Sequence, residues 1–359
     1  MRSALRSLVG DLLVRLLREY SPTFMEEGAV RALKEFVEER LDFDVVRIDS
    51  TGNLVASYGE GDVSIAFVGH IDTVPGELPV RFSGGFIEGR GAVDAKGPLA
   101  AAFVGASAAR TSAVDGVARV YAIAVVGEEG PSHGAWGLIR DGFMVDHLVI
   151  CEPSNATGVV VEYRGSLGIE VSCRSPGEHS SNPRAARSAC DKLIDLWLKL
   201  ESLNSSKGVS VALTKLVCGS DAPVLPREGV ARLDVRVPYG SGKEVVENFV
   251  KASLPEGCAY SVRSYVEPVK VPINSTVVRA VIRSLIRQGV RPRVVRKLGT
   301  SDMNILYGRA SREAVSYGPG NPELSHTDRE VVSLKDLELS ARVYAGVVKE
   351  VLQLRGPRV

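Results

Sequence analysis

The chain has 359 residues, of which 45% are hydrophobic and 24% charged, as is typical of a globular protein with a full core. The length suits two domains, or one domain with a large insertion, and the composition excludes collagen-like and largely disordered chains. Lysine and arginine number 44 against 43 acidic residues, a net charge of +1. The overall charge therefore gives no reason to expect nucleic-acid or membrane binding.

The cysteines and the N-terminal segment bear on the compartment. Five cysteines, an odd number without CxxC spacing, predict neither a disulfide framework nor a cysteine-type zinc site, and favour a reducing cytoplasm. Charged residues at Asp11, Arg15 and Arg18 interrupt the first apolar stretch, which excludes a signal peptide or membrane span there. Glutamine occurs only at positions 288 and 353, which hints at a thermophilic source.

In chain order, the first half alternates predicted helices with apolar strands. Helices are expected over residues 3–20, 26–40 and 98–109. Continuous apolar runs, typical of strands covered on both faces, lie at 63–69, 118–126 and 147–151. This alternation predicts an α/β fold with a mainly parallel sheet flanked by helices.

From about residue 164 the pattern changes to the order βαββαβ, which suits an inserted α+β domain of ferredoxin-like type. Its strands are expected at 165–174, 209–217, 230–237 and 259–267, and its helices at 183–203 and 242–253. Afterwards helices are expected at 275–288 and 333–354, and strands at 293–298 and 314–317. We therefore predict a catalytic domain from residues 1–163 and 273–359, with an inserted domain at 164–272.

Polar residues follow several apolar segments, where active sites form in open α/β sheets. The segments lead into His70-Ile71-Asp72, Asp94-Ala95-Lys96, Glu128-Glu129 and Glu152, and a late loop carries Ser325-His326-Thr327-Asp328. Each of these motifs alone is commonly structural. Together, several carboxylates at the ends of apolar segments need compensating charge, which divalent metal ions would supply. Carboxylates and imidazoles without cysteine suit zinc, cobalt or manganese in a catalytic site.

The same motifs resemble those of the M20 family of metallopeptidases and deacylases, which includes acetylornithine deacetylase and succinyl-diaminopimelate desuccinylase. The resemblance covers essentially the whole chain, with GHIDTVPG, GRGAVDAKG, GEEG, CEPS, GTSD and SHTDRE in the family's order. It implies a zinc-peptidase-like catalytic domain and an inserted lid and dimerisation domain, hence a homodimer. It also implies two divalent metal ions, with Zn²⁺ as the preferred metal and Co²⁺ as the alternative.

The resemblance implies a role for each motif residue. His70 and Glu152 would bind one metal ion, Glu129 and His326 the other, and Asp94 would bridge the two. Asp72 would orient the His70 imidazole, and Glu128 would be the general base and acid. Family members often carry another residue at Ala95, which is not expected to bind metal.

Residues outside the metal motifs are implied to contact the substrate. His179 matches a histidine that reaches the partner subunit's active site and stabilises the oxyanion. Arg236 matches an arginine that binds a substrate carboxylate. Further expected substrate contacts are Arg164, Gly299, Thr300 and Ser301.

The stretch GHIDTVPGELPVRFSGGFIEGRGAVDAKGPLAA is most similar to lysine/ornithine hydrolases of the amino-group carrier protein pathway. These release lysine or ornithine from the C-terminal glutamate side chain of a small acidic carrier, in lysine and arginine biosynthesis. Arg279, Arg283 and Arg287 share one face of a predicted helix. That face is either ordinary solvated surface or a docking patch for the acidic carrier.

Three alternative functions are weighed against this one. One is an acetylornithine deacetylase-like aminoacylase or a peptidase of the same family. A two-metal phosphoesterase or nuclease uses similar ligands, but the order of the motifs over the full length argues against it. A catalytically inactive binding protein would have lost a ligand or Glu128, and none is lost.

Overall fold

The computed structural model describes residues 2–205 and 208–355 and divides the chain into two compact units. The first unit comprises residues 1–161, 271–296 and 301–359, and the second comprises 162–270 and 297–300. Among the described residues, no helix combines the length and the apolar character that a membrane crossing requires.

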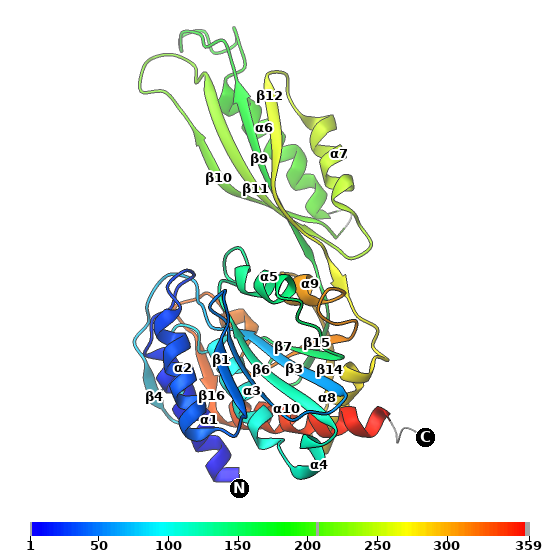
Figure 1. Cartoon of the computed structure of the whole chain (residues 1–359). Helices are drawn as coiled ribbons and strands as arrows, with labels where there is room; N and C mark the ends of the chain where they lie inside the picture. Colours follow the sequence, from blue (N-terminus) through cyan, green and yellow to red (C-terminus); the bar gives the residue numbers. More distant parts are fainter. Residues whose placement is uncertain (1, 206–207, 356–359) are drawn as a thin grey trace. The chain divides into compact units, whose positions relative to one another are not determined.

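The first unit is built on a sheet whose strand order is β1-β2-β6-β3-β7-β15-β8-β13, with β14 also pairing with β8 (Figure 1). Its central strands β6, β3, β7 and β15 run parallel, whereas β1, β2 and β8 pair antiparallel. The strands are β1 (Val45–Ile48), β2 (Leu54–Tyr58), β3 (Val63–His70), β6 (Ala118–Val125), β7 (His147–Cys151), β8 (Gly158–Tyr163), β13 (Val269–Lys270), β14 (Arg293–Lys297) and β15 (Ala314–Tyr317). The predicted α/β class with a mainly parallel sheet is confirmed.

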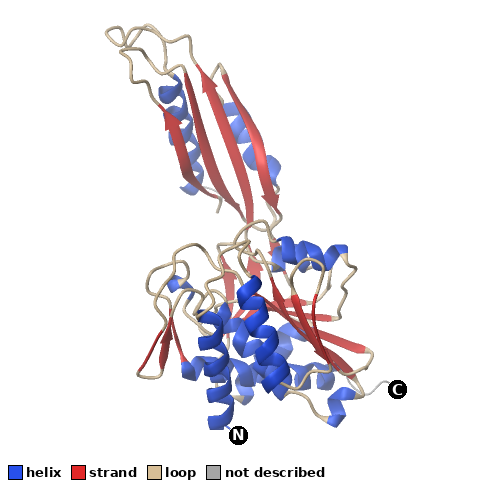
Figure 2. Ribbon diagram, turned by 60° about the vertical axis from the view of Figure 1, so that its left-hand side comes forward, coloured by secondary structure: helices blue, strands red, loops and turns tan. Residues whose placement is uncertain are grey.

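Helices cover this sheet and supply most of the remaining core (Figure 2). The alanine-rich α3 (Lys96–Ala108) packs on β3 and β6, and its small side chains let α10 (Leu334–Arg355) approach closely. The other helices are α1 (Arg2–Leu17), α2 (Glu27–Arg40), α4 (Ser112–Asp115), α5 (His133–Arg140), α8 (Thr276–Arg287) and α9 (Met303–Leu306). A small separate sheet has the order β16-β5-β4, from Val331–Ser333, Phe86–Glu88 and Arg81–Ser83.

The second unit is an antiparallel sheet of order β10-β11-β9-β12 with two helices. Its elements are β9 (Gly165–Arg174), α6 (Ala189–Glu201), the 3₁₀ turn η1 (Ser202–Ser205), β10 (Ser210–Cys218), β11 (Glu228–Val237), α7 (Lys243–Ser253) and β12 (Cys258–Val266). Burial alternates along β9 and β11 because one face of the sheet packs on the apolar core that α6 and α7 share.

The start of α6 differs from the expected helix at 183–203. The helix begins at Ala189, because Ser188 forms a capping box with Asp191: each residue's side chain bonds the other's backbone N–H. Residues 183–187 therefore form part of the preceding loop.

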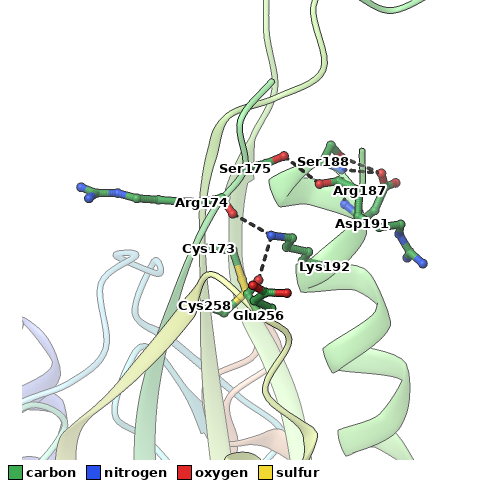
Figure 3. Close-up of a disulfide and its surroundings, with 9 residues drawn as sticks. All are labelled: Cys173, Arg174, Ser175, Arg187, Ser188, Asp191, Lys192, Glu256 and Cys258. Atoms are coloured by element: carbon green, nitrogen blue, oxygen red, sulfur yellow. Dashed lines mark hydrogen bonds between the residues drawn. A yellow bond between two sulfur atoms is a disulfide. The ribbon is translucent and has the colours of Figure 1, made fainter. Parts of the chain in front are cut away.

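The expectation that the cysteines form no disulfides is wrong. Disulfides join Cys173 to Cys258 and Cys190 to Cys218, both in the second unit, while Cys151 is buried and free. Cys173 and Cys258 face each other in the β9–β12 register. Nearby, the Lys192 ammonium donates hydrogen bonds to the carbonyls of Arg174 and Glu256, each at 2.8 Å (Figure 3). The register brings together cysteines 85 residues apart, which spacing in the sequence does not reveal.

Candidate metal centre

The carboxyl ends of three neighbouring parallel strands supply four of the six residues of the centre. His70 is the last residue of β3, Glu128 and Glu129 follow β6, and Glu152 follows β7. Because β6, β3 and β7 are adjacent in the sheet, these side chains meet at one edge. The His70 Nε2 atom lies 3.7 Å from Glu152 Oε1 and 4.0 Å from Glu128 Oε2.

Asp94 lies between two histidines. Its Oδ1 is 3.1 Å from His70 Nε2, and its Oδ2 is 3.5 Å from His326 Nε2. Asp94 stands on a turn just before α3, and His326 stands on the loop before β16 with a positive φ of 63°. His326 Nε2 also lies 2.7 Å from Glu129 Oε1. One carboxylate thus faces two separate imidazole groups through its two oxygens.

These side chains form three overlapping groups of three residues. Within each group, the ligand atoms lie within 4.8 Å of one another. The groups are His70 with Asp94 and Glu152, His70 with Glu128 and Glu129, and Asp94 with Glu129 and His326. Four carboxylates around two imidazoles, with His70 only 1% exposed, form a site whose negative charge needs compensation. Nitrogen and oxygen donors without sulfur suit divalent zinc, cobalt or manganese.

Asp72 organises the centre through more than one contact. The Nδ1 atom of His70 lies 3.0 Å from the Asp72 carbonyl oxygen and 3.4 Å from its carboxylate. The carboxylate accepts hydrogen bonds from the backbone N–H groups of Glu128 and Glu129, each at 3.0 Å, and from the Thr23 hydroxyl at 2.7 Å. Asp72 therefore holds the Glu128-Glu129 loop against the end of β3.

Burial and hydrogen bonding shift the pKa values of groups in the centre. Burial raises the pKa of the Glu128 carboxyl well above its usual range; His70 opposes the shift, and the charges of Glu152 and Asp302 add to it. The hydrogen bond to Glu129 raises the pKa of His326. A carboxyl whose pKa is raised toward neutrality is suited to exchange protons near physiological pH.

Asp302, the last residue of the GTSD motif that was expected to line the substrate pocket, is a buried acid near the charged groups of this site. It is 3% exposed, and burial raises the pKa of its carboxyl to about 7. Among the described residues its Oδ1 has no hydrogen-bond partner. Its place directly after Ser301 in the GTSD motif was the only available signal.

The predicted substrate contacts lie mainly in the second unit. An Arg236 guanidinium nitrogen lies 3.3 Å from the Thr300 hydroxyl, and the same side chain pairs with Asp234 at 2.9 Å. Arg164 contacts the Ser210 hydroxyl at 3.5 Å. Two of the predicted residues, Arg236 and Thr300, are thus brought together, with Gly299 next to Thr300 in the sequence.

His179 and Ser301 lie elsewhere. His179 is exposed on the loop between β9 and α6, where its Nδ1 lies 2.8 Å from the Ser181 hydroxyl. Ser301 is buried in the first unit, where its hydroxyl accepts a hydrogen bond from the Met303 backbone N–H at 3.2 Å.

Proteins of similar sequence match nearly the whole chain. A protein of Aeropyrum pernix is 38% identical over 342 residues, with 94% of each chain covered. A protein of Sulfurisphaera tokodaii, named "[LysW]-lysine/[LysW]-ornithine hydrolase", is 34% identical over 349 residues, with 96% of each chain covered. A protein of Saccharolobus islandicus with the same name is 33% identical, also with 96% of each chain covered.

Solved structures share the fold. The aminopeptidase PepT from Bacillus cereus has a TM-score of 0.80 at 20% identity, covering 97% of this chain and 99% of that chain. The model of peptidase family M20/M25/M40 matches residues 66–350. This chain is therefore a metal-dependent amide hydrolase that belongs to peptidase family M20/M25/M40.

Proposed function

We propose that this enzyme releases lysine, ornithine or both from the C-terminal glutamate side chain of a small acidic amino-group carrier protein. The names of relatives that match 96% of the chain support this substrate. The observation that carries the chemistry is the cluster of His70, Asp94, Glu129, Glu152 and His326 around one edge of the sheet, with Glu128 beside it.

We assign two divalent ions to this cluster. Zn²⁺ is the preferred metal for both positions, and Co²⁺ is the alternative. His70 with Glu152 would hold one ion, and Glu129 with His326 the other. Asp94 would bridge the two, in keeping with its two oxygens facing different histidines. When bound, such a pair polarises an amide carbonyl and lowers the pKa of bound water toward neutrality.

Glu128 is the proposed proton carrier. Its carboxylate would accept a proton from the attacking water and deliver it to the nitrogen of the leaving amine as the C–N bond breaks. The Asp72 hydrogen bonds to the Glu128 and Glu129 backbone would fix that carboxylate at the centre. Its raised pKa suits both steps, because the group must gain and then lose a proton in each turnover.

The second unit would orient the substrate. Arg236, supported by Thr300, would bind a carboxylate of the released amino acid, and Arg164, Gly299 and Ser301 would line the pocket. His179 would stabilise the oxyanion in a partner subunit, which makes the proposed enzyme a homodimer with the insertion as its dimerisation domain, residues 164–272.

The proposed compartment is the cytoplasm, where amino-acid biosynthesis takes place. The two disulfides do not exclude it, because intracellular proteins of hyperthermophiles are often disulfide-rich.

A hydrolysis panel tests the proposal. Enzyme loaded with Zn²⁺ or Co²⁺ is offered carrier-linked lysine, carrier-linked ornithine, acetylornithine, succinyl-diaminopimelate and simple dipeptides. We expect turnover of the carrier conjugates and its loss in Glu128→Gln by about 10²–10⁴-fold in kcat, with metal content retained. Rapid turnover of acetylornithine without the conjugates would contradict the carrier substrate, and near-normal turnover by Glu128→Gln would remove Glu128 from its role.

A further inference from the structure

We propose that the buried ion pair Arg90–Glu330 is a positioning device that joins the loops carrying Asp94 and His326, and thereby sets the affinity of the centre for its metal. The inference rests on the proposed metal site but not on the identity of the substrate. Neither residue is a ligand in the proposed centre.

The Glu330 carboxylate binds the turn that carries Asp94. Its Oε2 accepts hydrogen bonds from the backbone N–H groups of Gly91 at 3.0 Å, Val93 at 3.1 Å and Asp94 at 3.3 Å. Three N–H groups that converge on one oxygen fix the path of this turn and hence the direction in which the Asp94 side chain leaves it. Glu330 stands four residues after His326, so it ties the His326 loop to the Asp94 turn.

Arg90 makes the same connection from the other side. Its Nη1 donates to Glu330 Oε1 at 2.7 Å and to the carbonyl oxygen of Thr327, the residue after His326, at 2.9 Å. Its Nε donates to the Gly76 carbonyl at 2.7 Å. One guanidinium group thus holds three backbone segments together.

The burial of the pair shows how tightly these segments are joined. The side chains of Arg90 and Glu330 are 6% and 1% exposed. A buried ion pair is costly unless further hydrogen bonds satisfy its atoms, and here each partner has several. Removing either charge leaves the other buried and uncompensated, so the loops must rearrange to admit water.

This arrangement parallels that of Asp72, which fixes a different loop of the centre. Asp72 fixes the backbone of Glu128 and Glu129, and Glu330 fixes the backbone next to Asp94. Groups that hold a ligand's position without touching the metal typically contribute about 10- to 100-fold in metal affinity.

The test compares metal binding in three variants. Glu330→Gln removes the charge while retaining the shape, and Arg90→Lys retains a charge but loses the planar group that reaches two carbonyl oxygens and the Glu330 carboxylate. Glu338→Gln is the matched control: Glu338 is also a buried acid paired with an arginine, at 2.6 Å from Arg6, but it lies on α10. Zn²⁺ dissociation constants are measured by chelator competition on metal-free protein, together with the melting temperature without metal.

We expect Glu330→Gln to weaken Zn²⁺ binding by about 10- to 100-fold, Arg90→Lys to weaken it by less, and Glu338→Gln to leave it unchanged. Added Zn²⁺ should restore turnover in Glu330→Gln. If Glu330→Gln does not fold, Arg90→Lys decides the question by the same titration. Unchanged Zn²⁺ affinity in the folded variants, or equal weakening in Glu338→Gln, would overturn the proposal. Failure of the wild-type protein to bind Zn²⁺ would instead contradict the proposed metal site.

Discussion

At the scale of single residues, the centre combines groups that a sequence reveals with groups that only the fold reveals. Histidine and acid motifs such as His70-Ile71-Asp72 could be found because chemistry demands those residue types after buried strands. The contacts of Asp72 with the backbone of Glu128 and Glu129, 56 and 57 residues away, could not. They depend on β3 and β6 being neighbours in the sheet, which no local pattern encodes.

Asp302 provides a residue-scale prediction. Its negative charge contributes to the raised pKa of Glu128. Asp302 is ionised near and above its own pKa of about 7, and in that range Asp302→Asn removes its charge, so Glu128 should lose its proton at lower pH. The acid limb of the kcat/KM profile should therefore move to lower pH, as measured by initial rates between about pH 4 and pH 8, which span the relevant titration range.

The control for this experiment is Ser301→Ala, which changes the neighbouring residue without changing charge. An acid limb that stays in place in Asp302→Asn, or moves equally in Ser301→Ala, would show that Asp302 does not act on Glu128 electrostatically.

At the scale of elements, prediction succeeded for the central strands, whose sequences are continuous apolar runs. The apolar runs at 63–69, 118–126 and 147–151 correspond to β3, β6 and β7, since strands covered on both faces leave continuous apolar sequence. The short strands β1 and β2 had no predicted counterpart, and neither did α5. Burial along β1 is partial, which gives a weak periodic signal in four residues.

The disulfides of the second unit provide an element-scale prediction. A cross-link that closes a loop constrains the unfolded chain, and Cys173–Cys258 spans 85 residues against 28 for Cys190–Cys218. The chain-entropy relation assigns them about 4.5 and about 3.5 kcal/mol. Replacing Cys173 and Cys258 by serine should therefore lower the melting temperature more than replacing Cys190 and Cys218.

Differential scanning calorimetry with and without reductant measures both effects. The variant lacking all four cysteines should no longer respond to reductant, while Cys151→Ser should respond as the wild type does. A wild-type melting temperature that reductant does not change would indicate that the disulfides contribute no stability.

At the scale of the whole molecule, the net charge of +1 conceals strong local charge. An acidic cluster occupies the metal centre, and arginines gather on α8 and the segment after it. Two of those arginines already share an acidic partner, although their side chains are 44% and 57% exposed: Arg283 Nε lies 2.9 Å from the buried Glu350 carboxylate, and Arg287 pairs with the same group.

Carrier docking should therefore be tested at Arg279 and Arg291, which are exposed. Their reversal to glutamate should raise KM for carrier-linked lysine and weaken its dependence on salt, because electrostatic attraction to an acidic partner is screened by ions. Turnover of a small amide should be unchanged. Arg47→Glu is the matched control. Arg47 is exposed on β1, at one edge of the sheet, whereas Arg291 precedes β14, which pairs with β8 near the other edge.

Equal effects of the Arg279 and Arg291 reversals on the carrier-linked substrate and the small amide would contradict docking at this surface. If Arg47→Glu raised KM for carrier-linked lysine as much as the Arg279 and Arg291 reversals do, the effect would come from net charge in general.

The number of metal ions bound per chain tests the central claim most directly. Isothermal titration of metal-free enzyme with Zn²⁺, checked by elemental analysis after gel filtration, should give two ions per chain. His326→Ala should retain one, because the pair His70 and Glu152 remains intact in that variant. A single ion in the wild-type protein, or two ions retained by His326→Ala, would contradict the proposed centre.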